Sequence, residues 1–168
     1  VQNLLAAIEA GDLDDVTIVT NSLTSAQVIS EFMSSQGWTD DTARLSLHLV
    51  GGVVRPNTHA TTWGDNVSRE SVELLQELGR GEKPMTFGFV GGNGFDLETG
   101  ITMGTSDELG FKRFVLEHSE QSFVVADSSK AGISLPVRIA GWNEPLTLLT
   151  NVLPPEVLPR LEELVLSG

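Results

Sequence analysis

The sequence of 168 residues contains no cysteine, so neither a disulfide framework nor a thiolate metal site can form. Its histidines, His48, His59 and His118, are widely separated and show no His-x-x-x-His spacing. Zinc sites are built from cysteine, histidine and carboxylate ligands placed close together. We therefore expect no metal site, and the lack of thiols fits a cytoplasmic protein.

Basic residues are also scarce. Lysine and arginine total 10 against 23 aspartates and glutamates, which gives a formal net charge of −13 at pH 7. A surface of this sign repels the phosphodiester backbone of DNA. The sequence shows neither a charged-then-apolar leader nor an apolar run near the roughly 20 residues that a membrane-spanning helix needs. We expect a soluble, cytoplasmic chain that by itself binds neither DNA nor a membrane.

The common nucleotide-binding and hydrolase motifs are missing as well. There is no Gly-x-x-x-x-Gly-Lys-Ser/Thr phosphate loop and no Gly-x-Gly-x-x-Gly dinucleotide turn, so binding of ATP or NAD is disfavoured. No Gly-x-Ser-x-Gly elbow is present to carry a hydrolase nucleophile. We expect the protein to work without a cofactor.

Short apolar runs typical of buried strands alternate with segments of helical periodicity. Strands are predicted at residues 16–20, 45–50, 85–90, 122–126 and 146–150. Helices are predicted before Gly11, at 25–36, around 72–78, at 106–118 and after Pro154-Pro155. This alternation predicts an α/β fold with an open, mostly parallel, Rossmann-like sheet and helices on both faces. The length favours a single domain over residues 1–168.

Polar residues follow two of these predicted strands at the point where each strand ends. Ala126-Asp127-Ser128-Ser129-Lys130 comes directly after the apolar run 122–125, and Gly91-Gly92-Asn93-Gly94-Phe95-Asp96 follows the strand at 85–90. Open α/β sheets place their ligands at the carboxyl ends of the strands. The two junctions therefore predict a small-molecule site.

A wider pattern is carried by five segments: Val16-Thr17-Ile18-Val19-Thr20-Asn21-Ser22, Leu49-Val50-Gly51-Gly52-Val53-Val54-Arg55-Pro56, Gly91-Gly92-Asn93-Gly94-Phe95-Asp96, Gly100-Ile101-Thr102 and Ala126-Asp127-Ser128-Ser129-Lys130. In order and spacing they resemble the effector-binding domain of DeoR-family bacterial transcriptional regulators. The resemblance runs from about residue 16 to the C-terminus. It implies a sugar-phosphate-sensing domain with a fold related to the sugar-phosphate isomerases. Such a domain is normally fused to an N-terminal winged helix-turn-helix that binds DNA.

The resemblance also suggests what precedes the first residue. The family domain opens with a strand and an Asp-Ser-Gly-Thr-Thr-like loop at a helix N-terminus, which is a ready anion site. Val1-Gln2-Asn3-Leu4-Leu5 resembles the inside of the helix that follows that loop. We therefore expect the chain to be truncated, without the DNA reader, one strand and part of the phosphate site.

Asp127 and Lys130 are the first candidates for ligand contacts. They lie three residues apart after a strand, so the carboxylate can accept hydrogen bonds from sugar hydroxyls while the ammonium pairs with phosphate. The alternative is a turn in which Asp127 bonds its own backbone and Lys130 is solvated. The resemblance favours the binding role, and Ser128 belongs to the same motif.

The glycine-rich loop after residue 90 has two interpretations. Gly91, Gly92 and Gly94 permit positive φ and a close approach of backbone to ligand, or they serve only a tight strand-to-helix turn. Asn93 stands where the family more often has Asp. An amide keeps an acceptor and adds a donor, but it cannot act as an ionised base.

Other loops supply further candidates. Thr20 and Asn21 end a predicted strand, although capping of the next helix by residue 21, 22 or 24 is the preferred explanation of these polar groups taken alone. Arg55 follows Gly51 and Gly52 and can contact phosphate through two N–H groups, or it is a solvated surface residue.

Glu108 is a candidate from the resemblance alone. The family has a Glu-rich turn before a lysine, and Ser106-Asp107-Glu108 before Lys112 replaces it in part. A Glu and a Lys four residues apart also form ordinary pairs on a helix surface. The candidate ligand-binding residues are thus Thr20, Asn21, Gly51, Gly52, Arg55, Gly91, Gly92, Asn93, Gly94, Glu108, Asp127, Ser128 and Lys130.

Two functions of different classes fit these residues. In the first, a phosphorylated sugar or related metabolite binds at the strand ends and shifts the population of two quaternary arrangements, which changes the spacing of attached DNA readers. In the second, a sugar-phosphate isomerase, Asp127 and Lys130 shuttle a proton and stabilise an enediolate. Asn93 in place of a carboxylate weighs against turnover. We therefore favour a sensor, and expect a homo-oligomer without catalytic residues.

Overall fold

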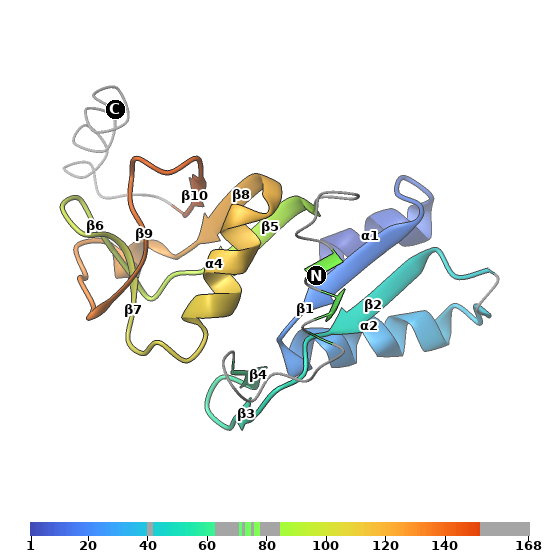
Figure 1. Cartoon of the computed structure of the whole chain (residues 1–168). Helices are drawn as coiled ribbons and strands as arrows, with labels where there is room; N and C mark the ends of the chain where they lie inside the picture. Colours follow the sequence, from blue (N-terminus) through green and yellow to red (C-terminus); the bar gives the residue numbers. More distant parts are fainter. Residues whose placement is uncertain (40–41, 63–70, 72, 75, 78–84, 152–168) are drawn as a thin grey trace. The chain divides into compact units, whose positions relative to one another are not determined.

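The computed structural model describes residues 1–39, 42–62, 71, 73–74, 76–77 and 85–151. Two compact units make up the chain, Val1–Glu73 and Leu74–Gly168 (Figure 1). Part of the helix predicted around 72–78 and the whole helix predicted after Pro154-Pro155 lie outside the described residues. Within the described part, every helix is too short or too polar to span a bilayer.

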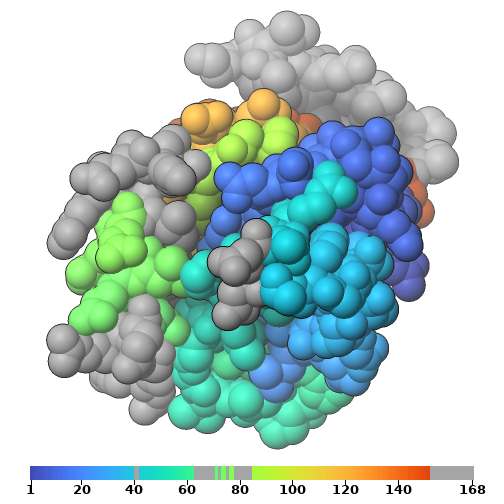
Figure 2. Space-filling model, turned by 90° about the vertical axis from the view of Figure 1, so that its right-hand side faces the viewer, coloured from blue at the N-terminus to red at the C-terminus, as the bar shows by residue number. Residues whose placement is uncertain are grey.

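The first unit is built on two parallel strands. β1 (Val16–Thr20) pairs with β2 (Leu45–Leu49), with Val16 opposite Leu45 and Thr20 opposite Leu49. Parallel neighbours need a crossover connection, and here α2 (Leu23–Ser35) supplies it. Figure 2 shows the surface of this unit, where the blue residues of α2 lie beside the cyan residues of β2.

The helices of this unit form a common hydrophobic core with the strands. α1 (Gln2–Ala10) contributes Leu5 and Ile8, and α2 contributes Ile29, which packs with Leu45 of β2 in one buried cluster. α1 ends where predicted, because Gly11 adopts φ 85° and its N–H caps carbonyls of the last turn. The apolar positions of both helices therefore face this core, except Val28 of α2, which is exposed.

α2 begins two residues earlier than predicted, because Ser22 caps it. The Ser22 Oγ accepts a hydrogen bond from the Ser25 N–H at 3.2 Å, and the Ser22 backbone is extended, as N-cap residues usually are. Capping by residue 22 was one of the alternatives for the polar segment after β1, and it is the one that the structure adopts.

Replacing Ser22 by Ala is expected to lower the free energy of unfolding by about 1 kcal/mol, because one N–H of the first turn loses its acceptor. Urea denaturation followed by circular dichroism measures this loss. Ser30→Ala is the matched control, since Ser30 is an exposed residue inside the same helix. An equal loss in both variants would contradict the cap.

The second unit contains a parallel sheet in the order β10-β8-β5. Its strands are β5 (Met85–Gly91), β8 (Ser119–Val125) and β10 (Thr147–Leu149), and Phe89 lies opposite Phe123, which lies opposite Thr147. α4 (Leu109–Glu117) packs against β5 and β8 (Figure 1). The predicted strands are all present, and the α/β class with parallel principal strands is confirmed.

Aromatic side chains gather on one face of β5 and β8. The Phe89 ring stacks on Phe123 with centroids 5.0 Å apart, and Phe87 approaches Phe123 at 6.4 Å. Phe87 and Phe89 are 55% and 60% exposed. Alternate residues of the same strands, such as Val90 and Val124, are buried. The two faces of these strands therefore differ in burial, as the alternation of side chains along a strand requires.

An antiparallel sheet of three strands, absent from the sequence predictions, completes this unit. Its order is β6-β7-β9, with β6 (Gly94–Asp96), β7 (Gly100–Met103) and β9 (Val137–Ala140). All four residues of β7 are buried. The first unit likewise contains a short antiparallel hairpin of β3 (Val54–Arg55) and β4 (Ala60–Thr61).

One arginine connects α4 to the antiparallel sheet. Arg113 Nη1 donates to the Ile139 carbonyl at 3.0 Å and to Glu144 Oε2 at 2.5 Å, and Nη2 donates to Glu117 Oε1 at 2.6 Å.

The helix predicted at 106–118 is shorter than expected. α4 begins at Leu109, and Glu108 occupies its N-cap position without a side-chain cap bond.

Candidate functional site

The carboxyl ends of the three parallel strands in the second unit lie side by side. Gly91 of β5 and Leu149 of β10 are both in register with Val125 of β8. Beyond the strands, the Gly92 N–H donates to the Val125 carbonyl at 3.1 Å, and the Ala126 N–H donates to the Leu149 carbonyl at 3.1 Å. The two polar junctions predicted from the sequence therefore meet at one edge of the sheet.

The Asp127 motif forms a short 3₁₀ turn, η1 (Ser128–Lys130), with Asp127 at its N-cap. The Asp127 Oδ1 accepts hydrogen bonds from the Ser129 hydroxyl and, at 2.9 Å, from the Ser129 N–H. These bonds lower the pKa of the Asp127 carboxyl, and the positive charge of Lys130 adds to the effect. The predicted turn is thus present, with Oδ1 of Asp127 bonded to Ser129. The Asp127 carboxylate is exposed and ionised, so it can accept further hydrogen bonds.

Backbone hydrogen bonds fix this turn next to the glycine loop. The Lys130 N–H donates to the Asp127 carbonyl at 3.0 Å, and the Gly132 N–H donates to the Phe95 carbonyl at 2.9 Å. Ala131 forms an isolated bridge with Phe95. Lys130 itself is half-buried. The motif that carries the predicted charges is therefore held beside residues 91–95.

Sequence reasoning missed Asn151 at this edge. Its Oδ1 accepts a hydrogen bond from the Ser128 N–H at 2.6 Å, so a residue just past β10 helps to hold η1. A signal was available, because Asn151 stands just past a predicted strand, as Asp127 and Asn93 do.

The glycines of the 91–94 loop have different roles. None of Gly91, Gly92 and Gly94 has the positive φ that the sequence allowed, so that part of the expectation is wrong. A β-carbon at Gly94 would clash with the Ile133 carbonyl oxygen, so this glycine is required for close packing. A β-carbon at Gly91 would have no atom within 4 Å. Gly91 and the exposed Asn93 are therefore the accessible residues of the loop.

Glu108 reaches this loop through Lys112. The Lys112 Nζ lies 3.9 Å from Glu108 Oε2, and it donates a hydrogen bond to the Gly91 carbonyl at 2.7 Å. Both side chains are only 13% exposed, which distinguishes them from an ordinary helix surface pair. The sequence indicates Lys112 only as a partner of Glu108. Its contact with Gly91 spans 21 residues, so no local pattern signals it.

The candidates in the first unit take part in several hydrogen bonds of that unit. The Asn21 Nδ2 donates to the Thr61 carbonyl at 3.0 Å, and the Thr20 Oγ1 accepts from the Ser22 N–H at 3.1 Å. These bonds support a structural role for Thr20 and Asn21. The cap of α2 itself is the neighbouring Ser22.

The Gly51-Gly52 turn and Arg55 belong to the same unit. The Gly51 N–H donates to the Ser71 Oγ at 2.7 Å, and a β-carbon at Gly52 would clash with the Thr62 carbonyl oxygen. Arg55 is half-buried in β3, and its carbonyl accepts the His59 N–H at 2.9 Å. Gly52 is thus explained by close packing of the turn against the residue that follows β4.

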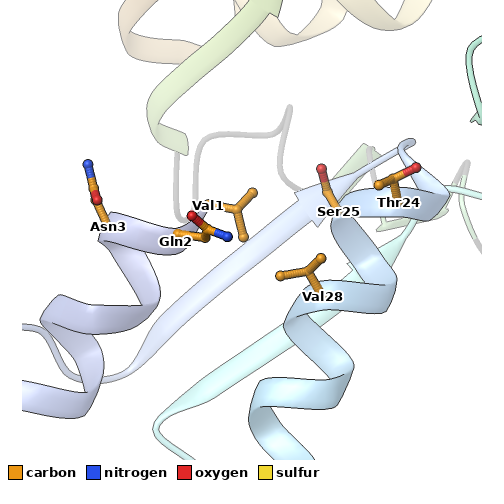
Figure 3. A pocket seen from close by; sticks show the side chains of 6 residues that line it. All are labelled: Val1, Gln2, Asn3, Thr24, Ser25 and Val28. Atoms are coloured by element: carbon orange, nitrogen blue, oxygen red, sulfur yellow. The ribbon is translucent and has the colours of Figure 1, made fainter.

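A cavity of about 460 Å³ opens between the first turns of α1 and α2. It is lined by Val1, Gln2, Asn3, Thr24, Ser25 and Val28 (Figure 3). Its lining combines hydroxyl and amide groups with two valines, and it includes none of the candidate ligand-binding residues named from the sequence. Among the residues that the structure describes, no three His, Asp or Glu side chains converge into a group able to hold a metal ion.

Comparison with protein families identifies the class of the chain. The family model of the DeoR C-terminal sensor domain matches residues 1–152, which is most of the sequence. No curated protein matches the chain. The matched segment includes both junctions of the carboxyl edge, at residues 91–96 and 126–130. The chain belongs to the family of DeoR C-terminal sensor domains.

Proposed function

We propose that this chain is the effector-binding part of a DeoR-type transcriptional regulator and that its effector is a phosphorylated sugar or a related phosphorylated metabolite. Membership of the family supports ligand sensing. The observation that carries the proposal further is the meeting of Asp127, Lys130 and the Gly91–Asn93 loop at one edge of a parallel sheet. Such edges are where open α/β sheets bind small molecules.

Each group at this edge has a complementary part in such a ligand. The Lys130 ammonium is a compact positive charge suited to a phosphate. The Asp127 carboxylate accepts hydrogen bonds from sugar hydroxyls, and its lowered pKa keeps it ionised at neutral pH. The open space at Gly91 lets the ligand approach the backbone closely.

The same electrostatics favour sensing over isomerisation. A general acid or base works best when its pKa lies near the operating pH, whereas the pKa of Asp127 is shifted downward by its bonds to Ser129. Asn93 cannot serve as an ionised base. Ligand binding would then act by shifting the population of quaternary states and so the spacing of DNA readers in the complete regulator.

Phosphorylated sugars are expected to bind at least about tenfold more tightly than the same sugars without phosphate, because a charge-assisted contact is worth roughly 1.5 to 3 kcal/mol. Titration calorimetry with the pairs glucose and glucose 6-phosphate, and fructose and fructose 6-phosphate, measures the ratio. Inorganic phosphate added as competitor should weaken binding of the phosphorylated member. Equal affinities within every pair, or no binding of any phosphorylated member, would contradict the proposal.

A further inference from the structure

The peptide group between Gly91 and Gly92 is held at both of its polar ends. Its carbonyl oxygen, that of Gly91, accepts a hydrogen bond from Lys112 Nζ at 2.7 Å. Its N–H, that of Gly92, donates to the Val125 carbonyl at 3.1 Å. Because a peptide group is planar, two hydrogen bonds on opposite sides fix its orientation. Glycines on both sides of this peptide would otherwise leave it conformationally free.

Lys112 is well placed to hold this carbonyl. Its side chain is 13% exposed, so water has limited access to compete for the ammonium. Glu108, one turn earlier along α4, lies 3.9 Å from the ammonium and is equally shielded. A hydrogen bond from an ionised donor is stronger than one between neutral groups. The pair therefore connects the start of α4 to the end of β5.

The held peptide lies between the two halves of the proposed site. Asn93 follows it directly on one side. On the other side, its partner Val125 directly precedes the segment Ala126–Lys130 that forms the turn. A β-carbon at Gly92 would lie 3.7 Å from the Ala126 β-carbon, so Gly92 lies near the residue that precedes Asp127. A rotation of this peptide would change the relative position of Asn93 and Asp127.

We infer that Lys112 is a positioning residue of the effector site, acting through the Gly91–Gly92 peptide and oriented by Glu108. The inference deepens the proposed function and rests on it for the role of the edge as a ligand site. Lys112 pre-orders the loop, so that binding does not bear the full cost of ordering it.

The test compares Lys112→Met with wild type in two measurements. Met keeps an unbranched side chain of similar length but removes the donor and the charge. We expect exchange of the Gly92 amide, followed by NMR, to become at least about tenfold faster, because the local opening of this peptide costs less free energy. The Kd for the phosphorylated sugars is expected to rise about threefold to fivefold, since the loop must then be ordered on binding.

Arg113→Met is the matched control on the same helix. Arg113 connects α4 to Ile139 and Glu144, so its loss should lower the melting temperature without changing the exchange of the Gly92 amide. Lys112→Arg retains a charged donor and should keep the exchange rate within about threefold of wild type. If Lys112→Met does not fold, Glu108→Gln is the substitute, with an expected smaller acceleration at Gly92.

Equal Gly92 exchange rates in the Lys112 and Arg113 variants would overturn the inference, as would faster exchange without any change in Kd. The exchange measurement needs no ligand. A wild-type chain that binds none of the phosphorylated sugars would therefore contradict the proposed function, while the exchange rates would still decide whether Lys112 holds the peptide.

Discussion

Replacing Phe95 by Ala is expected to lower the free energy of unfolding by about 3 to 5 kcal/mol, the usual cost of removing a large aromatic side chain from a core. Phe95 is 1% exposed and lies in β6, opposite Ile101 of β7. The substitution would be made at a residue whose backbone carbonyl accepts a hydrogen bond from the Gly132 N–H. Denaturation with guanidinium chloride, followed by tryptophan fluorescence, measures the change.

Phe87→Ala is the matched control, because the same side chain is removed from a position that is 55% exposed. Its expected cost is below about 1 kcal/mol, since less apolar surface returns to water. If the two variants lose the same stability, Phe95 is not the core residue that its burial indicates. A loss confined to Phe95 would confirm that the antiparallel sheet contributes strongly to the stability of the second unit.

Replacing Lys130 by Ala is expected to weaken binding of phosphorylated sugars by at least about tenfold, through the loss of one charge-assisted contact of roughly 1.5 to 3 kcal/mol. The melting temperature should stay nearly unchanged, because it is the Lys130 backbone that closes η1, and Ala keeps that backbone. Calorimetric titration and a thermal melt of the same sample separate the two effects.

Two further variants make this test specific. Lys130→Arg retains the positive charge and should recover part of the affinity, and Arg138→Ala removes one positive charge from an exposed position elsewhere in the unit. The Arg138 variant should bind as wild type does. A fall in stability without a fall in affinity for Lys130→Ala would mean that Lys130 is structural and that the ligand binds elsewhere.

The parallel strands were predictable because their signal is local. Residues 16–20 and 85–90 are apolar runs bounded by polar or glycine-rich segments, and they form β1 and β5 almost as expected. The strands β6 and β7 were missed, because Gly94 and Gly100 give their sequence the character of a loop. β7 pairs with β6 on one side and with β9 on the other, and β9 begins more than thirty residues after β7 begins.

The site shows the same division. Asp127 and Asn93 could be proposed because they stand within two residues of the ends of strands, and the structure brings their segments together; their role in binding stays a prediction. Lys112 was not found, because its partner Gly91 lies 21 residues away in the sequence. Asn151 was overlooked although it stands just past a predicted strand, and its partner Ser128 lies 23 residues away. Sequence patterns locate the ends of strands, whereas the side chains that hold those ends come from distant elements and depend on the tertiary fold.

The order of strands in the parallel sheet also determines when the sheet can form during synthesis on the ribosome. The central strand β8 pairs with β5, which is synthesised before it, and with β10, which is synthesised after it. Among the residues that the structure describes, the last contributor to the carboxyl edge is Asn151, through its bond to Ser128. A nascent chain that has exposed only β5 and β8 therefore lacks β10 and Asn151, and these described parts of the edge can assemble only after translation has passed residue 151.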